Sequence, residues 1–304
     1  MSMFKKTTLA LAISALAGGA LAQSAPAPAP APAPATSPIT ANVTVVNDYR
    51  YRGMSQSNFK PAIQGGFDYA HESGFYIGNW NSSISWISDY YGNGGGGGLT
   101  GRNVSAPVEM DFYAGFKKEL IAPGFATDIG VLQYYYPSSG IPVTNGGVIS
   151  GTASYFANPN TTETYLAQNF TLGPVSGFVK FSYAISTLFG NQKTEGSYYP
   201  DLTLNYDTGA YGITLNGHIG YQYVAGKYPG TGNQPSNNAV YGYTDYKVGL
   251  TKDFGEGLSL AVAYVGTNAK RTITYGGNTY NGYVSPQNKN LGNGGGIISL
   301  TKTF

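Results

Sequence analysis

Hydrophobic and polar residues alternate along most of the chain between residue 40 and the C-terminus. In residues 108–118 every second position is hydrophobic or small, and these positions are Val108, Met110, Phe112, Ala114 and Phe116. The positions between them are Glu109, Asp111, Tyr113, Gly115 and Lys117. A period of two is that of a β-strand with one apolar and one polar face. Residues 42–52, 175–185 and 211–223 repeat the pattern.

The alternation divides the chain into twelve segments and predicts a strand for each. They are residues 41–52, 62–71, 75–86, 108–118, 125–136, 161–172, 175–186, 199–207, 210–224, 243–254, 258–268 and 296–304. Most have about the 9–11 residues that a tilted strand needs to cross a bilayer. In the first segment, Val43, Val45, Tyr49 and Tyr51 share the apolar face. We therefore predict an all-β fold, an antiparallel transmembrane β-barrel of about twelve strands over residues 41–304.

The predicted connections alternate between short and long. The five short ones are Glu72-Ser73-Gly74, residues 119–124, Gly173-Pro174, Thr208-Gly209 and Gly255-Glu256-Gly257. The six long ones are rich in Gly, Asn, Ser and Pro, as in residues 87–107, 137–160, 225–242 and 269–295. Outer-membrane barrels have short periplasmic turns and long extracellular loops. The alternation predicts the same two ends here.

Aromatic residues gather at the predicted strand ends. Tyr134, Tyr135 and Tyr136 precede a long loop, whereas Phe75, Tyr76, Phe254 and Phe304 lie at the short-turn end. This placement predicts aromatic girdles at the two membrane interfaces. On the last strand Ile298, Leu300 and Phe304 share one face, interrupted by Lys302. A terminal Phe304 on such a strand is similar to the signal that the barrel-assembly machinery reads during biogenesis.

The first 40 residues are read as a leader and a spacer. Lys5 and Lys6, the apolar residues 9–17 and the small residues of Ala20-Leu21-Ala22 predict a secretory signal peptide over residues 1–22. Residues 25–34 alternate Ala and Pro. Proline fixes φ and removes backbone donors, so residues 23–40 are predicted to form an extended periplasmic linker.

Composition narrows the class of protein. Only 11% of the residues are charged, against roughly 25% in soluble domains. Beyond the leader, no apolar run reaches the 18 or more residues of a membrane helix, and the mean hydropathy is −0.17. Without Lys5 and Lys6 the basic and acidic residues are equal in number, so no basic patch predicts a nucleic-acid partner.

Catalytic and metal-binding patterns are missing from the sequence. There is no cysteine, and the two histidines, His71 and His218, have no Ser and Asp partners at a predicted common site. The glycines of residues 94–98 lack the Lys-Ser/Thr ending of a phosphate loop. We predict no enzyme activity, no metal and no cofactor.

The polar strand faces carry charges of both signs. In lipid an Arg or Lys would cost about 2–4 kcal/mol at the bilayer midplane, so these faces are predicted to line the lumen. The candidate lumen or constriction residues are Asp48, Arg50, Arg52, Asp68, Glu109, Asp111, Lys117, Lys180, Asp245 and Lys247, with Asp201 and Asn205 on the same faces.

Two segments near the N-terminus resemble a known family. Residues 42–56, with Asn47-Asp48-Tyr49-Arg50-Tyr51-Arg52-Gly53, are similar to the opening motif of the TorF-type porins, a proteobacterial outer-membrane family. Residues 64–78, with Gln64-Gly65-Gly66-Phe67-Asp68, resemble the same motif, and residues 299–304 are similar to its close. The resemblance implies an outer-membrane barrel with pore activity, and it implies no particular substrate.

Together these patterns predict an outer-membrane, porin-like channel for passive diffusion of small solutes or ions, in contact with outer-membrane lipid. A charged interior can also be a salt-bridged plug that only holds the barrel together. Eight strands enclose a filled interior and sixteen an aqueous channel, so a count of twelve leaves both alternatives open. A third alternative is adhesion through the long loops. The sequence does not predict the oligomeric state.

Overall fold

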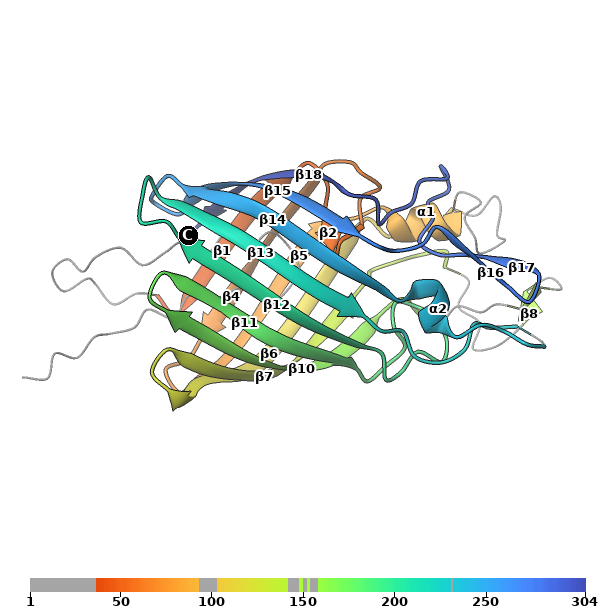
Figure 1. Cartoon of the computed structure of the whole chain (residues 1–304), viewed down its shortest axis with the longest axis horizontal. Coiled ribbons are helices and arrows are strands. Elements are labelled where there is room, and N and C mark those ends of the chain that lie inside the picture. The colour runs from red at the N-terminus through yellow and green to blue at the C-terminus, as the bar shows by residue number, and fades with distance from the viewer. Residues whose placement is uncertain (1–36, 93–102, 142–147, 150–151, 154–157, 231) are drawn as a thin grey trace, which may run out of the picture.

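The computed structural model describes residues 37–92, 103–141, 148–149, 152–153, 158–230 and 232–304. Twelve antiparallel strands form one closed barrel (Figure 1). The strands are β1 (Ile39–Val46), β4 (Ala62–Ala70), β5 (Phe75–Ser83), β6 (Val108–Ala122), β7 (Phe125–Tyr135), β10 (Thr161–Leu172), β11 (Val175–Ala184), β12 (Tyr198–Asp207), β13 (Ile213–Gln222), β14 (Tyr243–Asp253), β15 (Leu258–Thr267) and β18 (Gly295–Thr303). The predicted fold class and strand count are confirmed. The predicted signal peptide and most of the predicted linker lie outside the described residues.

Neighbouring strands in the sequence are neighbours in the barrel, and β18 pairs with β1 to close it. The closing ladder matches Val43 with Lys302 and Val45 with Leu300. Because each strand is paired on both sides, the barrel has no open edge that could pair with another chain.

The exterior of the barrel is apolar. On β1, Val43 and Val45 point outward and are exposed, whereas Thr44 and Val46 between them are buried inside. The other strands repeat this arrangement, with Phe112, Val179 and Ile219 among the exposed residues. A soluble barrel has its apolar side chains inside, whereas here they lie outside, as is typical of a barrel surrounded by lipid. The described part of the chain contains no helix of the length and apolarity that membrane crossing requires.

The two ends of the barrel differ as predicted. Short turns, such as Pro123-Gly124 between β6 and β7, lie at the end where the C-terminus is found (Figure 1). The long connections lie at the other end. They contain α1 (Trp86–Gly92), α2 (Asn237–Tyr241) and three hairpins, β8 (Val148–Ile149) with β9 (Thr152–Ala153), β16 (Thr272–Tyr275) with β17 (Asn278–Asn281), and β2 (Arg50–Tyr51) with β3 (Met54–Ser55).

The prediction of a first strand over residues 41–52 is wrong in its second half. β1 ends at Val46, and residues 48–58 fold into the barrel. Arg52 (φ +45°) and Gly53 (φ +77°) form the turn of the β2–β3 hairpin, and positive φ at both central residues is typical of a tight hairpin turn. Tyr49 and Tyr51 therefore do not face lipid, because both are buried within the barrel. Elsewhere the predicted strand ends differ by a few residues.

The prediction of aromatic girdles is correct for only part of the aromatic residues. Tyr135, Phe75, Phe254 and Phe304 point outward and are exposed. The side chains of Tyr76, Tyr134 and Tyr136 are instead buried in the interior. Adjacent strand residues point to opposite faces, so a run of three tyrosines cannot lie wholly on the lipid side.

Candidate functional site in the barrel lumen

The β2–β3 hairpin reaches from β1 to distant strands across the lumen. The Tyr49 hydroxyl donates a hydrogen bond to Glu109 on β6 at 2.6 Å. The Tyr51 and Tyr134 hydroxyls, on the hairpin and β7, are 2.7 Å apart. At the hairpin tip, a Cβ on Gly53 would lie 2.5 Å from Thr267 on β15, so only glycine fits there. The hairpin therefore contacts the wall on several sides.

Arg52 connects the hairpin to the opposite wall. Its guanidinium forms an ion pair with Glu163 on β10 at 2.7 Å and donates to Gln222 on β13 at 2.7 Å. It also lies over the ring of Tyr199 on β12, with 4.2 Å between the guanidinium carbon and the ring centroid. Arg52 is 8% exposed. Burial lowers the pKa of Arg52, but the Glu163 carboxylate raises it and the net change is upward, so the guanidinium stays charged.

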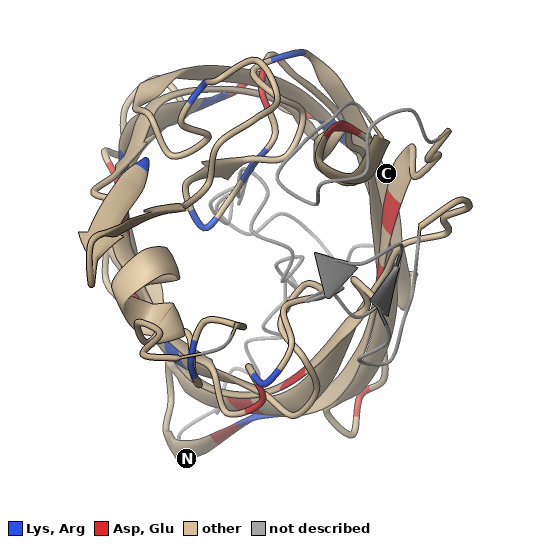
Figure 2. Ribbon diagram, turned by 90° about the vertical axis from the view of Figure 1, so that its right-hand side faces the viewer, with Lys and Arg blue, Asp and Glu red and all other residues tan. Residues whose placement is uncertain are grey.

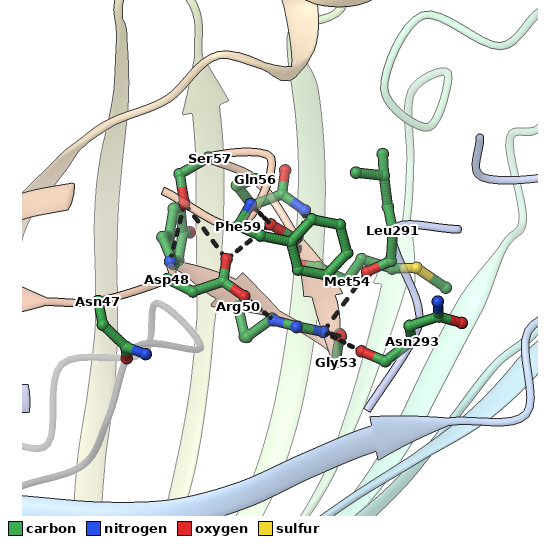
Figure 3. Close-up of polar contacts among 12 residues, drawn as sticks. Asn47, Asp48, Arg50, Gly53, Met54, Gln56, Ser57, Phe59, Leu291 and Asn293 are labelled. Carbon is green, nitrogen blue, oxygen red and sulfur yellow. Dashed lines mark hydrogen bonds and ion pairs between the residues drawn. The ribbon is translucent and has the colours of Figure 1, made fainter. Parts of the chain in front are cut away.

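Arg50 anchors the base of the hairpin (Figure 3). Its guanidinium donates to Asp48 at 2.6 Å and to the carbonyls of Gly53 and Asn293 at 2.9 and 2.8 Å. The second oxygen of Asp48 accepts from Ser55 at 2.6 Å. Through its Nε and Nη1 atoms, Arg50 fixes the hairpin against the segment before β18.

Tyrosine–carboxylate pairs fill much of the remaining interior. The pairs are Tyr113 with Asp68, Tyr76 with Asp128, Tyr199 with Asp245, and Tyr49 and Tyr136 with Glu109. Tyr76 lies flat against Gly115, where a Cβ would meet its hydroxyl at 2.4 Å. Burial, followed by the Glu109 and Asp111 carboxylates, raises the pKa of Tyr49 well above its usual value. The phenol therefore remains neutral and keeps its proton for the bond to Glu109.

Two cavities lie on either side of the hairpin. The outer one, which we call the vestibule, has a volume of about 570 Å³ and lies among the long loops beside α1 and β17. The inner cavity has a volume of about 150 Å³ and lies beneath the hairpin, along β11–β15 and β18. Tyr51 lines both cavities. The hairpin therefore lies at the boundary between the two cavities.

The inner cavity is lined by charged residues. Some of them lie close to a residue of opposite charge, and others have no such neighbour among the described residues. His218 Nε2 is 3.0 Å from Asp245, and His218 Nδ1 is 3.9 Å from Asp201. Lys180 lies over the ring of Tyr165 at 4.6 Å. Neither Lys180 nor Lys247 makes a hydrogen bond or an ion pair within 4 Å to any residue in the described ranges. Both lysines line the inner cavity, so they contribute positive charge to it.

Eight of the ten predicted lumen residues are buried inside the barrel, and the other two, Lys117 and Lys247, are half-buried on inward-facing strand positions. Acidic and basic residues occur around the ring when it is viewed from the loop end (Figure 2). The structure places Arg52, Lys180, Asp245 and Lys247 around the inner cavity together with the Asp48–Arg50 pair. Asp68, Glu109, Asp111 and Lys117 lie on the wall of β4 and β6, away from that cavity.

Sequence reasoning missed two parts of this site. Glu163 was not among the predicted residues, although it shares a strand face with Thr161 and Tyr165, and that alternation could have identified it. The vestibule was missed altogether, because loops from five connections form it. Among the described residues, no group of three or more His, Cys, Asp or Glu could hold a metal ion.

Residues 30–304 match the family described as "Bacterial protein of unknown function (Gcw_chp)". No curated protein sequence matches the chain. Similar solved structures include the KdgM porin, at 7% identity and a TM-score of 0.44, which covers 88% of this chain and 97% of the porin. An outer membrane channel from Pseudomonas putida F1 has 13% identity and a TM-score of 0.46 over 88% of this chain and 96% of its own. The toluene transporter TodX from Pseudomonas putida has 10% identity and a TM-score of 0.42 over 87% of both chains.

Proposed function

The chain belongs to the Gcw_chp family, and from this premise and the geometry of its lumen we propose that it is a narrow outer-membrane channel for small solutes or ions. The observation that carries the proposal is the pair of cavities within one barrel, which meet at the β2–β3 hairpin, where Tyr51 lines both. A barrel held together by a solid plug has no need of a charged cavity on one side and an open vestibule on the other. Lumen charges select ions and solutes where a pore is narrow.

Several features support a place in the outer membrane. The apolar exterior suits lipid, and residues 1–22 have the pattern of a signal peptide. Phe304 is 71% exposed on the outer face, where the barrel-assembly machinery can read it. The resemblance of residues 42–56 to the opening motif of the TorF-type porins agrees with this location.

Single-channel recording in planar bilayers tests the proposal. The refolded barrel is expected to give discrete openings, because the inner cavity and the vestibule meet at Tyr51, which lines both. A native barrel that inserts and never opens would favour the structural plug. Binding to surfaces that disappears when the loop 87–107 or 269–295 is deleted, without any conductance, would favour adhesion.

Lys180 and Lys247 are expected to set the ion selectivity. Two charges about 8 Å apart interact by about 0.5 kcal/mol in water, so removing both ammonium groups changes the energy of a passing ion by about 1 kcal/mol. The change has opposite signs for a cation and an anion, so we expect Lys180→Gln with Lys247→Gln to raise the cation-to-anion permeability ratio by up to about thirtyfold. Reversal potentials in a dilute KCl gradient measure this ratio, because salt screens the charges at higher concentration.

The matched control removes two lysines outside the lumen. Lys252 and Lys302 lie at the short-turn end, where they donate to the carbonyls of Tyr211 and Glu256. Lys252→Gln with Lys302→Gln is expected to leave the reversal potential unchanged. Equal shifts in both double variants would place the selective charges outside the inner cavity.

A further inference from the structure

Aromatic side chains form a continuous part of the vestibule wall. Five tyrosines that line it contact one another in the order Tyr280, Tyr228, Tyr241, Tyr283 and Tyr243, with neighbouring ring centroids 5.0–6.1 Å apart. Except for Tyr228 with Tyr241, neighbouring rings meet at 66–85°. The rings therefore do not form one flat stack, and their faces point in different directions.

The phenol hydroxyls of this wall are bonded to the protein. The Tyr280 hydroxyl donates to Gln234 at 3.0 Å, and the Tyr283 hydroxyl donates to the carbonyl of Tyr241 at 3.1 Å. Because these donors are used, the two side chains offer a ligand ring surface in place of hydrogen bonds. The face of an aromatic ring is negative and attracts cations.

The vestibule also carries one negative charge. Asp89 of α1 is the only charged residue of the described lining. Its Oδ2 atom accepts from Ser85 at 2.9 Å and from Asn58 at 3.2 Å. Its Oδ1 atom accepts no bond from the described residues and retains accessible surface. The described lining is thus negative overall.

The basic residues closest to the vestibule are engaged elsewhere. Lys289 lies over the ring of Phe59, with 5.4 Å between Nζ and the centroid. Arg271 donates to the amide oxygen of Asn288, and Arg52 belongs to the ion pair across the lumen. None of these three cations lines the vestibule, so none competes directly with a bound cation.

We propose that the vestibule is a binding site for organic cations of the alkylated ammonium class. Aromatic rings whose faces surround a quaternary ammonium group bind it without hydrogen bonds, and Asp89 supplies the opposite charge. The volume of about 570 Å³ falls within the roughly 300–1,000 Å³ of small-molecule pockets. An anion would meet the Asp89 carboxylate with no cation in the described lining. The site lies outside the hairpin and needs no conduction through the lumen.

The test is equilibrium dialysis of the refolded full-length barrel against radiolabelled choline. The detergent is a polyoxyethylene ether, because phosphocholine and amine-oxide detergents carry a group similar to the ligand and would compete. The matched neutral ligand is neohexyl alcohol, in which carbon replaces the charged nitrogen of choline. Choline is expected to saturate the site and to bind at least about tenfold more tightly than the alcohol. Equal affinities, tighter binding of the alcohol, or no saturable choline binding overturns the proposal.

Asp89→Asn tests the charge. The amide keeps one oxygen that can accept from Ser85 and Asn58, so the variant changes charge more than shape. It is expected to weaken choline binding roughly fivefold and to leave the affinity for neohexyl alcohol unchanged. The control, Glu195→Gln, removes a carboxylate from an exposed loop position outside the vestibule lining, and no change is expected. Unchanged choline binding in Asp89→Asn, or an equal loss in the control, contradicts the proposal.

Tyr283→Leu tests the aromatic wall independently of the charge. Tyr283 contacts both Tyr241 and Tyr243 and belongs to no barrel strand. Loss of its ring is expected to weaken choline binding about tenfold. Tyr283→Phe keeps the ring and is expected to stay within about twofold of the native affinity. Native affinity in the Leu variant, or the same loss in the Phe variant, would show that the ring does not hold the cation.

The result is separate from that of the conductance experiment. Choline binding to a barrel that never opens would contradict the channel and leave the vestibule site standing. A conducting barrel that binds no choline would do the reverse.

Discussion

Replacement of residues 50–55 by a Gly-Gly linker is expected to raise the single-channel conductance roughly three- to tenfold. These residues carry Tyr51 and Arg52 across the lumen, and no barrel ladder includes them. The two cut ends already meet, because the Gln56 nitrogen donates to the Tyr49 carbonyl at 2.8 Å. A two-residue loop therefore closes the gap without moving β1 or β4.

The deletion also removes two cations from buried partners. Asp48 loses Arg50, and Glu163 loses Arg52. A buried carboxylate without its partner destabilises a fold, so the deletion is combined with Asp48→Asn and Glu163→Gln. Conductance then reports the width of the lumen, separate from damage to the barrel.

A deletion of equal length in an outer hairpin provides the control. Residues 274–279 form the tip of β16–β17, which projects from the loop end of the barrel (Figure 1). Ile273 and Tyr280 face each other across its base, so a Gly-Gly linker closes this gap too. Conductance of the control is expected to stay near that of the native barrel. An unchanged conductance in the residue 50–55 deletion would show that the hairpin does not limit the pore.

The barrel could be predicted from the sequence because each strand residue faces one of two solvents. Phe112 is exposed on the outer face and Asp111 is buried in the interior, and this binary choice is visible residue by residue as alternation. Loop length carries the same kind of local information. Strand count, strand faces and the two ends of the barrel follow from these signals.

The inward hairpin could not be predicted, because its pattern continues that of β1. Tyr49 and Tyr51 fall on the same alternate positions as Val43 and Val45, and tyrosine occurs both at lipid interfaces and in polar interiors. What decides between these environments is the presence of Glu109 and Tyr134. Both lie more than fifty residues further along the chain, and no local pattern encodes their distance.

The roles of individual charged residues could not be predicted from the sequence either. Their placement inside the barrel followed from the cost of charges in lipid. Arg50 and Arg52 nevertheless have different tasks, because Arg50 donates to carbonyls of the segment before β18, whereas Arg52 pairs with Glu163 across the lumen. A strand pattern treats them as equivalent positions. Only their tertiary partners show that Arg50 anchors the hairpin and that Arg52 forms an ion pair across the lumen.

Replacement of Arg52 by Met is expected to destabilise the barrel by about 3–5 kcal/mol. The ion pair with Glu163 is deeply buried, with side-chain exposures of 6% and 2%. Loss of the guanidinium leaves the Glu163 carboxylate unpaired, and it also removes the contact with Tyr199. Urea titration of the refolded barrel, followed by the fluorescence of Trp80 and Trp86, measures the loss.

The double variant Arg52→Met with Glu163→Gln separates the charge from the packing. Because it leaves no buried charge behind, it is expected to recover about 2–3 kcal/mol relative to Arg52→Met alone. With Glu163→Gln measured as well, the double-variant cycle gives the coupling energy of the pair. Arg271→Met is the control, since Arg271 is exposed in the loop before β18, and a surface change of this kind stays within about 0.5 kcal/mol. A double variant as unstable as the sum of its single variants would mean that Arg52 acts through its packing on Tyr51 and Tyr199. In that case the hairpin is held across the lumen by aromatic contacts, and the ion pair contributes charge to the pore without fixing its width.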